Sequence, residues 1–152
     1  MSTSDEATVL LKFPLAVEDG WPPVAMESLP FLVSDAGYQA RVSPLFVKDL
    51  SVGDVIAATL GDENTVEDWG HITRSPHTTI WLLRLKQPNG IDAVLAELRS
   101  LGCNSVGLDT AGCYAIDVPE TISMEIVDSI LASLDGDSVG VAFPSMRHPE
   151  SA

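Results

Sequence analysis

Basic residues are scarce in this chain of 152 residues: eight lysines and arginines stand against 22 aspartates and glutamates, for a formal net charge of -14. Residues 1–76 hold four basic and 12 acidic side chains, and residues 78–152 hold four and ten. Nucleic acids and anionic membranes are excluded as partners, because binding to both depends on neutralising phosphates. A basic protein is the favoured partner. The alternative is that the acidity only keeps the chain soluble.

Cysteines and long apolar runs are also few. Cys103 and Cys113 are too few for a disulfide framework, and a reducing compartment would keep them as thiols. No apolar run reaches the roughly 18 residues that a membrane-spanning helix needs. The first residues, MSTSDEATVLLKFPL, carry acid where a signal peptide carries base. We therefore expect a cytoplasmic protein, and the apolar fraction of 45% predicts a globular one.

The sequence contains no motif that is typical of a catalytic site. The stretch GDENTVEDWG lacks the lysine and serine of a phosphate-binding loop, and no serine-hydrolase elbow occurs. The histidines, His71, His77 and His148, lack zinc-ligand spacing. We expect no catalytic residue, no cofactor and no metal. An enzyme that uses Cys103 or His77 stays open as a minor alternative, because a catalytic cysteine needs a histidine that only the fold could bring near.

The second half of the chain has the clearest pattern. Residues 78–86, TTIWLLRLK, predict a strand in which Trp81 alternates with Leu83 and Leu85 and belongs to the core. The next apolar residues have the spacing of one helical face that ends at Gly102: Ile91, Val94, Leu95, Leu98 and Leu101. Residues 103–108 and 113–118 predict a hairpin around the turn DTAG, and this pairing could bring Cys103 near Cys113.

The pattern continues after Pro119 with a second helix. Thr121 is its expected N-cap, and apolar residues at helical spacing run from Ile122 to Leu134. SVGVAF, residues 138–143, predicts a last strand. The order β-α-β-β-α-β predicts a ferredoxin-like half, residues 78–152, with two helices on one face of four strands.

The first half, residues 1–77, shows no convincing helix. Its short apolar segments are punctuated by Gly, Pro and Asp: 8–15, 30–33, 38–42, 55–60 and 68–73. This predicts a small β-sheet or a barrel of SH3-like size. The expected fold class is therefore α+β, with this barrel-like half packed on the ferredoxin-like half.

Two aromatic residues lie beside distinctive local sequence. GDENTVEDWGH, residues 61–71, places Asp62, Glu63, Glu67 and Asp68 just before Trp69. The spacing does not fit a calcium-binding EF-hand loop. We predict either a solvated hairpin tip or a recognition patch in which the carboxylates surround Trp69. Trp21, stiffened by two following prolines, either caps the core of the first half or binds a partner.

Five stretches together carry a family resemblance. They are WPPVAMESL (21–29), YQARVSPLFVKDLSVGDVI (38–56), SPHTTI (75–80), LGC (101–103) and AIDVP (115–119). In this order they resemble the bacterial family catalogued as domain of unknown function 4265, over roughly residues 8–145. Thr78 stands where that family often has Ser, and Trp81 where it often has Arg. The resemblance implies the domain organisation and no activity. Small acidic cytosolic proteins of such families often resemble antidotes to bacterial toxins.

The leading expectation is a non-enzymatic acidic protein that masks a basic protein partner, as an immunity protein or antitoxin masks a toxin. Its partner-binding residues would be Asp62, Glu63, Glu67, Asp68, Trp69 and Trp21. The alternative is a small-molecule-sensing regulatory domain, because ferredoxin-like domains of this kind bind ligands at sheet edges or subunit interfaces. The oligomeric state stays open.

Overall fold

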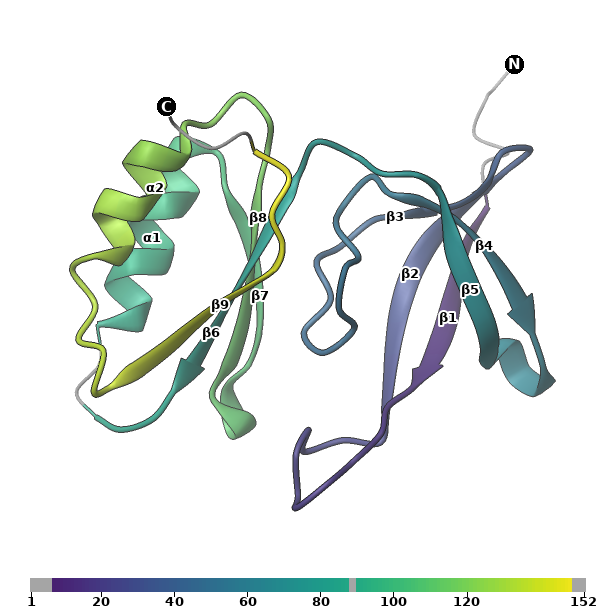
Figure 1. The fold of residues 1–152 in the computed structure, drawn as a ribbon, viewed down its shortest axis with the longest axis horizontal. Coiled ribbons are helices and arrows are strands. Elements are labelled where there is room, and N and C mark those ends of the chain that lie inside the picture. Colours follow the sequence, from purple (N-terminus) through teal and green to yellow (C-terminus); the bar gives the residue numbers. More distant parts are fainter. Residues whose placement is uncertain (1–6, 88–89, 149–152) are drawn as a thin grey trace. The chain divides into compact units, whose positions relative to one another are not determined.

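The computed structural model describes residues 7–87 and 90–148 (Figure 1). These residues form two helices and two antiparallel sheets, one of five strands and one of four, so the fold is α+β, as the sequence predicts. The chain divides into two compact units, residues 1–75 and 76–152. Each unit contains one of the sheets, and both helices belong to the second unit.

The sheet of the first unit is an antiparallel meander in the order β1-β2-β3-β4-β5. Its strands are β1 (Thr8–Pro14), β2 (Met26–Ser34), β3 (Gly37–Ala40), β4 (Val55–Leu60) and β5 (Val66–Thr73). Lys12 of β1 also forms an isolated bridge with Thr65, the residue before β5. The first strand of the meander and the start of the last one therefore lie beside each other.

The core of the first unit lies on one face of this sheet. Along β2 the residues Glu27, Leu29 and Phe31 are buried and alternate with more exposed ones, which is the period of a half-buried strand. Residues 41–54 form a long loop that adds Val47 and Leu50 to the same core. No α-helix is present in residues 7–75. In this unit the loop therefore covers the face of the sheet that a helix covers in many other proteins.

Two bulges interrupt the pairing of β4 with β5. Thr59 pairs with Asp68 but Leu60 pairs with Val66, which leaves Glu67 as an extra residue. Val55 pairs with Thr73 and Ile56 with His71, which leaves out the exposed Ile72 in the same way. An extra residue reverses the alternation of faces along a strand. The first bulge thereby allows Val66 and Trp69, three residues apart, both to contribute to the core cluster.

The second unit has the element order β6-α1-β7-β8-α2-β9 and the sheet order β7-β8-β6-β9. All neighbouring strands are antiparallel. The strands are β6 (Thr78–Arg84), β7 (Asn104–Leu108), β8 (Cys113–Val118) and β9 (Val139–Ser145), and the helices are α1 (Ile91–Leu101) and α2 (Met124–Leu131). Figure 1 shows both helices on the same face of this sheet.

Apolar packing between these helices and the sheet forms the second core. It includes Ile80 and Leu82 of β6, Val94 and Leu98 of α1, and Val127 of α2. The predicted end of α1 is confirmed: Gly102 adopts φ 107°, and its amide bonds to the carbonyl of Arg99. This left-handed C-cap favours glycine.

Two predictions for this unit are wrong. The second helix begins at Met124 with Ser123 as N-cap, not at Ile122 after Thr121, because the amide of Ile122 bonds to Pro119 in a turn. Trp81 does not belong to the helix-covered core. Ile80 and Leu82 fill that core, and strand alternation directs their neighbour Trp81 to the opposite face.

Candidate functional site

The acidic stretch forms the tip of the β4–β5 hairpin. Residues Asp62–Asn64 make a single 3-10 turn, and the amide of Gly61 bonds to the carbonyl of Thr65 at 2.8 Å across its base. Glu63 and Asn64 adopt positive φ values of 54° and 62°, which this tight reversal requires. The turn therefore holds its side chains on a short, ordered projection.

Four carboxylates extend from this hairpin into solvent, and we call them the acidic tip: Asp62, Glu63, Glu67 and Asp68. Glu63 makes an ion pair with Lys12 at 3.7 Å, although its side chain is 85% exposed. The part of the chain that the structure describes contains no Lys, Arg or His ion pair for the other three. The tip therefore carries negative charge that the unit itself leaves largely uncompensated.

Trp69 lies partly in the core and partly at the surface. Its ring meets Phe13 edge-on, with 6.0 Å between the ring centroids, and lies 5.3 Å from the ring of His71. Glu67, the extra residue of the bulge, is exposed two positions before it in the sequence. The surface of Trp69 available to a partner is therefore limited to the part that the core leaves open, and its role in recognition stays a prediction.

Trp21 is more exposed, at 48% of its surface. It belongs to the loop between β1 and β2, where its backbone exchanges two hydrogen bonds with Glu18 and its ring contacts Phe46 edge-on. This loop leaves the sheet at the end of β1, and the acidic tip lies near the same strand end, since Glu63 pairs with Lys12 (Figure 1). Trp21 and the acidic tip therefore project from the same end of the first sheet.

A buried carboxylate, which sequence reasoning missed, fixes the long loop of the first unit. Glu27 is 8% exposed, and its side chain accepts hydrogen bonds from the amides of Leu45, Phe46 and Val47. Burial raises the pKa of Glu27, and the three amides oppose that rise. Its role is structural, because it satisfies amides for which an irregular loop has no strand partner.

Asp54 has a similar role at the other end of this loop. It is fully buried, and its carboxylate accepts hydrogen bonds from the amides of Ser51 and Ser75 and lies 2.9 Å from Nε2 of His71. His71, one of the three candidate histidines, is thus engaged within the first unit.

The second histidine, His77, belongs to the second unit. Its Nδ1 lies 2.7 Å from Oδ1 of Asp117, a residue of β8 that is 3% exposed. Burial raises the pKa of Asp117, and the bond to His77 opposes that rise. The motif SPHTTI therefore places an ordered His–Asp pair at the start of β6.

The third histidine, His148, joins the end of the chain to the same strand. Its Nε2 lies 3.0 Å from the carbonyl oxygen of Pro119, so this nitrogen carries the proton. Its Nδ1 lies 2.6 Å from the hydroxyl oxygen of Thr78, and that oxygen accepts hydrogen bonds from the amides of Arg147 and His148. Thr78 is thereby a structural residue that anchors residues 147–148.

The two cysteines are free thiols at opposite ends of the β7–β8 hairpin. Cys113 pairs with Leu108 beside the turn, whereas Cys103 precedes Asn104, which pairs with Asp117 at the far end. The expected proximity of the two is therefore wrong, since only residues equally distant from the turn pair. Burial and the charge of Asp117 raise the pKa of Cys103 to about 11, which disfavours the nucleophilic thiolate.

In residues 7–87 and 90–148, no group of three or more His, Cys, Asp or Glu side chains is placed to hold a metal ion. No helix within those ranges has the length and apolar character needed to cross a bilayer.

The two sheets and the acidic hairpin define a two-unit α+β protein. The chain belongs to the family described as Domain of unknown function (DUF4265), whose model matches residues 27–141. No curated protein matches it. Among solved structures, it is similar to one titled "Novel crystal structure of a hypothetical protein from Neisseria gonorrhoeae", with a TM-score of 0.68 and 17% identity over 93% of this chain and 98% of the other. That similarity is one of fold.

Proposed function

We propose that the protein is a non-enzymatic binding protein that masks a basic partner, in the manner of an immunity protein or antitoxin. The acidic tip is the observation that carries this proposal: four exposed carboxylates on one tight hairpin, of which only Glu63 makes an ion pair within residues 7–87 and 90–148. Carboxylates fixed close together attract a cationic surface from a distance and orient it.

The aromatic residues supply the short-range part of the proposed contact. Trp21 is half exposed at the end of the sheet from which the acidic tip projects. Tryptophan is enriched among residues that dominate binding energy, since it buries a large area with little loss of conformational freedom. Trp69 adds the part of its ring that the core leaves accessible.

The fold and the thiols support the remainder of the proposal. We regard the first sheet as barrel-like, which the bridge between Lys12 and Thr65 supports, and the second unit as ferredoxin-like, which its element and strand order supports. We place the protein in the cytoplasm, where free thiols such as those of Cys103 and Cys113 persist.

The proposal is tested by immobilising the whole protein and passing a lysate of its own organism over it at low salt. A salt gradient then elutes what has bound. We expect a stoichiometric basic protein to elute as salt screens the carboxylates. Monodisperse, folded protein that retains no basic protein would contradict the proposal.

A small-molecule sensor is the second candidate, and the order β-α-β-β-α-β of the second unit favours it. This candidate predicts that one metabolite raises the melting temperature of the protein, since a ligand that binds only the native state stabilises it. A flat response across a metabolite panel argues against it. Catalysis by Cys103 is a weaker candidate, because its raised pKa opposes nucleophilic attack.

A further inference from the structure

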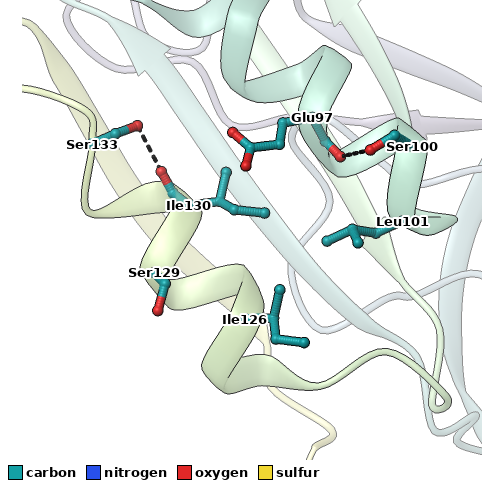
Figure 2. A pocket seen from close by; sticks show the side chains of 7 residues that line it. All are labelled: Glu97, Ser100, Leu101, Ile126, Ser129, Ile130 and Ser133. Atoms are coloured by element: carbon teal, nitrogen blue, oxygen red, sulfur yellow. Dashed lines mark hydrogen bonds between the residues drawn. The ribbon is translucent and has the colours of Figure 1, made fainter.

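The helix layer of the second unit contains a groove that the proposed function does not use (Figure 2). It runs between α1 and α2, is open to solvent, and has a volume of about 510 Å³. Glu97, Ser100 and Leu101 line it from α1, and Ile126, Ser129 and Ile130 line it from α2. Positions separated by three and four residues share one helix face, so each helix presents a continuous strip to the groove.

The floor of the groove is apolar and incompletely covered. Ile126 is 50% exposed and Leu101 is 37% exposed, and their side chains lie side by side in Figure 2. Ile130 continues the floor into the buried core of the unit. Covering exposed aliphatic groups in a concave site removes apolar surface from water, which favours the binding of a partner.

The walls of the groove are low. The hydroxyls of Ser100 and Ser129 donate to the carbonyls of Glu97 and Glu125 in their own helices, at 2.6 and 3.0 Å. Ser133, past the end of α2, bonds to Ile130 in the same way. Because these short side chains are turned back onto the backbone, a partner helix can approach the floor closely.

The charge around the groove is negative. Figure 2 shows the carboxylate of Glu97 directed toward α2. The first turn of α2 carries the exposed Glu125, one position before Ile126. Arg99, the basic residue of α1, is two positions from Glu97. Two positions are about 200° around a helix, so Arg99 faces away. No ion pair is recorded for Glu97 or Glu125 in the described ranges.

We propose that this groove binds a cationic amphipathic helix of a protein partner. Leucine-like side chains at i, i+3, i+4 and i+7 would cover Leu101 and Ile126, and lysines or arginines beside them would meet Glu97 and Glu125. A second copy of the chain is disfavoured, since it would bring its own net charge of -14 against these carboxylates. The groove belongs to the second unit and the acidic tip to the first, so this proposal stands independently of the acidic tip.

The test uses the full-length protein labelled with ¹⁵N and a synthetic helix about 14 residues long, with leucine at the four positions above and lysine elsewhere. We expect saturable amide shifts in α1 and α2 on titration. A peptide with glutamate in place of lysine should leave the spectrum unchanged. Two variants probe the charge: Glu97→Lys in the groove and Asp92→Lys on the same helix outside it. Glu97→Lys should weaken binding about fivefold more than Asp92→Lys.

A second matched pair probes the apolar floor. Ile126→Ser should weaken binding about tenfold, whereas Val141→Ser, an exposed substitution on β9, should leave it unchanged. Ile126 is 50% exposed and Val141 is 42% exposed, so both variants are expected to fold. A spectrum that confirms the native fold accompanies each titration.

Several results would overturn the proposal. Equal weakening by Glu97→Lys and Asp92→Lys would reduce the effect to net charge. Shifts confined to residues 61–69 would assign the peptide to the acidic tip. Concentration-dependent shifts in the groove without peptide would identify a second copy as its occupant. None of these results decides whether the acidic tip binds a basic protein, because the lysate experiment tests that. The groove proposal and the acidic-tip proposal can therefore be contradicted independently of each other.

Discussion

In the first unit a loop of irregular backbone, residues 41–54, covers the core face of the sheet, whereas in the second unit two helices cover it. A helix satisfies most of its own backbone amides, but a loop brings amides that need acceptors from elsewhere. In the first unit the buried carboxylates of Glu27 and Asp54 are those acceptors. In the second unit the buried carboxylate, that of Asp117, lies 2.7 Å from Nδ1 of the His77 side chain instead.

The abundant acidic residues of the chain therefore have two roles. Most carboxylates are exposed and give the surface its charge, as in the acidic tip. Glu27 and Asp54 are internal and hold a loop in place. A buried carboxylate with several hydrogen bonds is costly to remove, because its partners are then left without an acceptor.

The largest effect is expected at Asp54. Asp54→Ala removes the acceptor for two amides and for His71, so we expect the free energy of unfolding to fall by about 3 to 5 kcal/mol. Urea denaturation measures it. Asp35→Ala, at an exposed turn, serves as the control and should cost less than about 0.5 kcal/mol. Equal effects of the two variants would contradict the role of Asp54.

The helix-covered core is tested by Leu98→Ala. Leu98 is 1% exposed among apolar side chains of the second unit, and truncation of such a leucine costs about 2 to 5 kcal/mol through lost burial and a cavity. We expect Leu98→Ala to lower the free energy of unfolding by about 3 kcal/mol, measured by the same urea denaturation. A loss below about 1 kcal/mol would show that the helices contribute less to this core than the structure indicates.

Glu27→Gln tests the contacts between the buried carboxylate and the loop of the first unit. Glutamine keeps one acceptor oxygen, but its NH₂ group faces a backbone amide that needs an acceptor. We therefore expect the free energy of unfolding to fall by about 1 to 3 kcal/mol. Amide hydrogen exchange at residues 45–47 should accelerate, and this localises the effect to the loop. Unchanged exchange there would contradict the contacts of Glu27.

The same variant tests the pH dependence. Because the native pKa of Glu27 is raised above its ordinary value of 4.5, the native state binds more protons than the unfolded state between those two values. The contribution of this group to stability is therefore largest below pH 4.5 and falls as pH rises to the native pKa. Stability measured from pH 4 to 7 should show a smaller decline in Glu27→Gln than in the parent protein. Parallel curves would contradict the raised pKa.

The smallest effect concerns the thiols. Cys103 has a pKa of about 11, and burial raises that of Cys113 as well. Both should react slowly with a thiol reagent at pH 7.5 in the native state, and both should react at once in denaturant. Rapid modification of one thiol in the native protein would restore a reactive cysteine to consideration.

Much of the fold can be predicted from local patterns. The strands at 55–60 and 113–118 are confirmed at those bounds, and α1 begins and ends where its apolar spacing and Gly102 indicate. The bulge at Glu67 could not be predicted, because it depends on how β4 and β5 pair. Without it, simple alternation assigns Trp69 to the face opposite Val66.

The burial of one internal carboxylate can be inferred from its position in a strand, although the composition of the chain does not indicate it. Glu27 has the same strand parity as Leu29 and Phe31, so alternation alone places it on the buried face. A charge on that face predicts a set of hydrogen-bond donors opposite it. Which donors these are depends on the loop at 45–47, about 18 residues away in sequence, and no local pattern specifies that contact.

The most direct test of the binding role compares two baits in one lysate: the parent protein, and a variant with Asp62, Glu63, Glu67 and Asp68 all changed to lysine. All four side chains are exposed, so the variant is expected to fold. We expect a basic protein to be retained by the parent, to be released by salt, and to be lost from the variant. Retention of the same protein by both baits would contradict the assignment of recognition to the acidic tip.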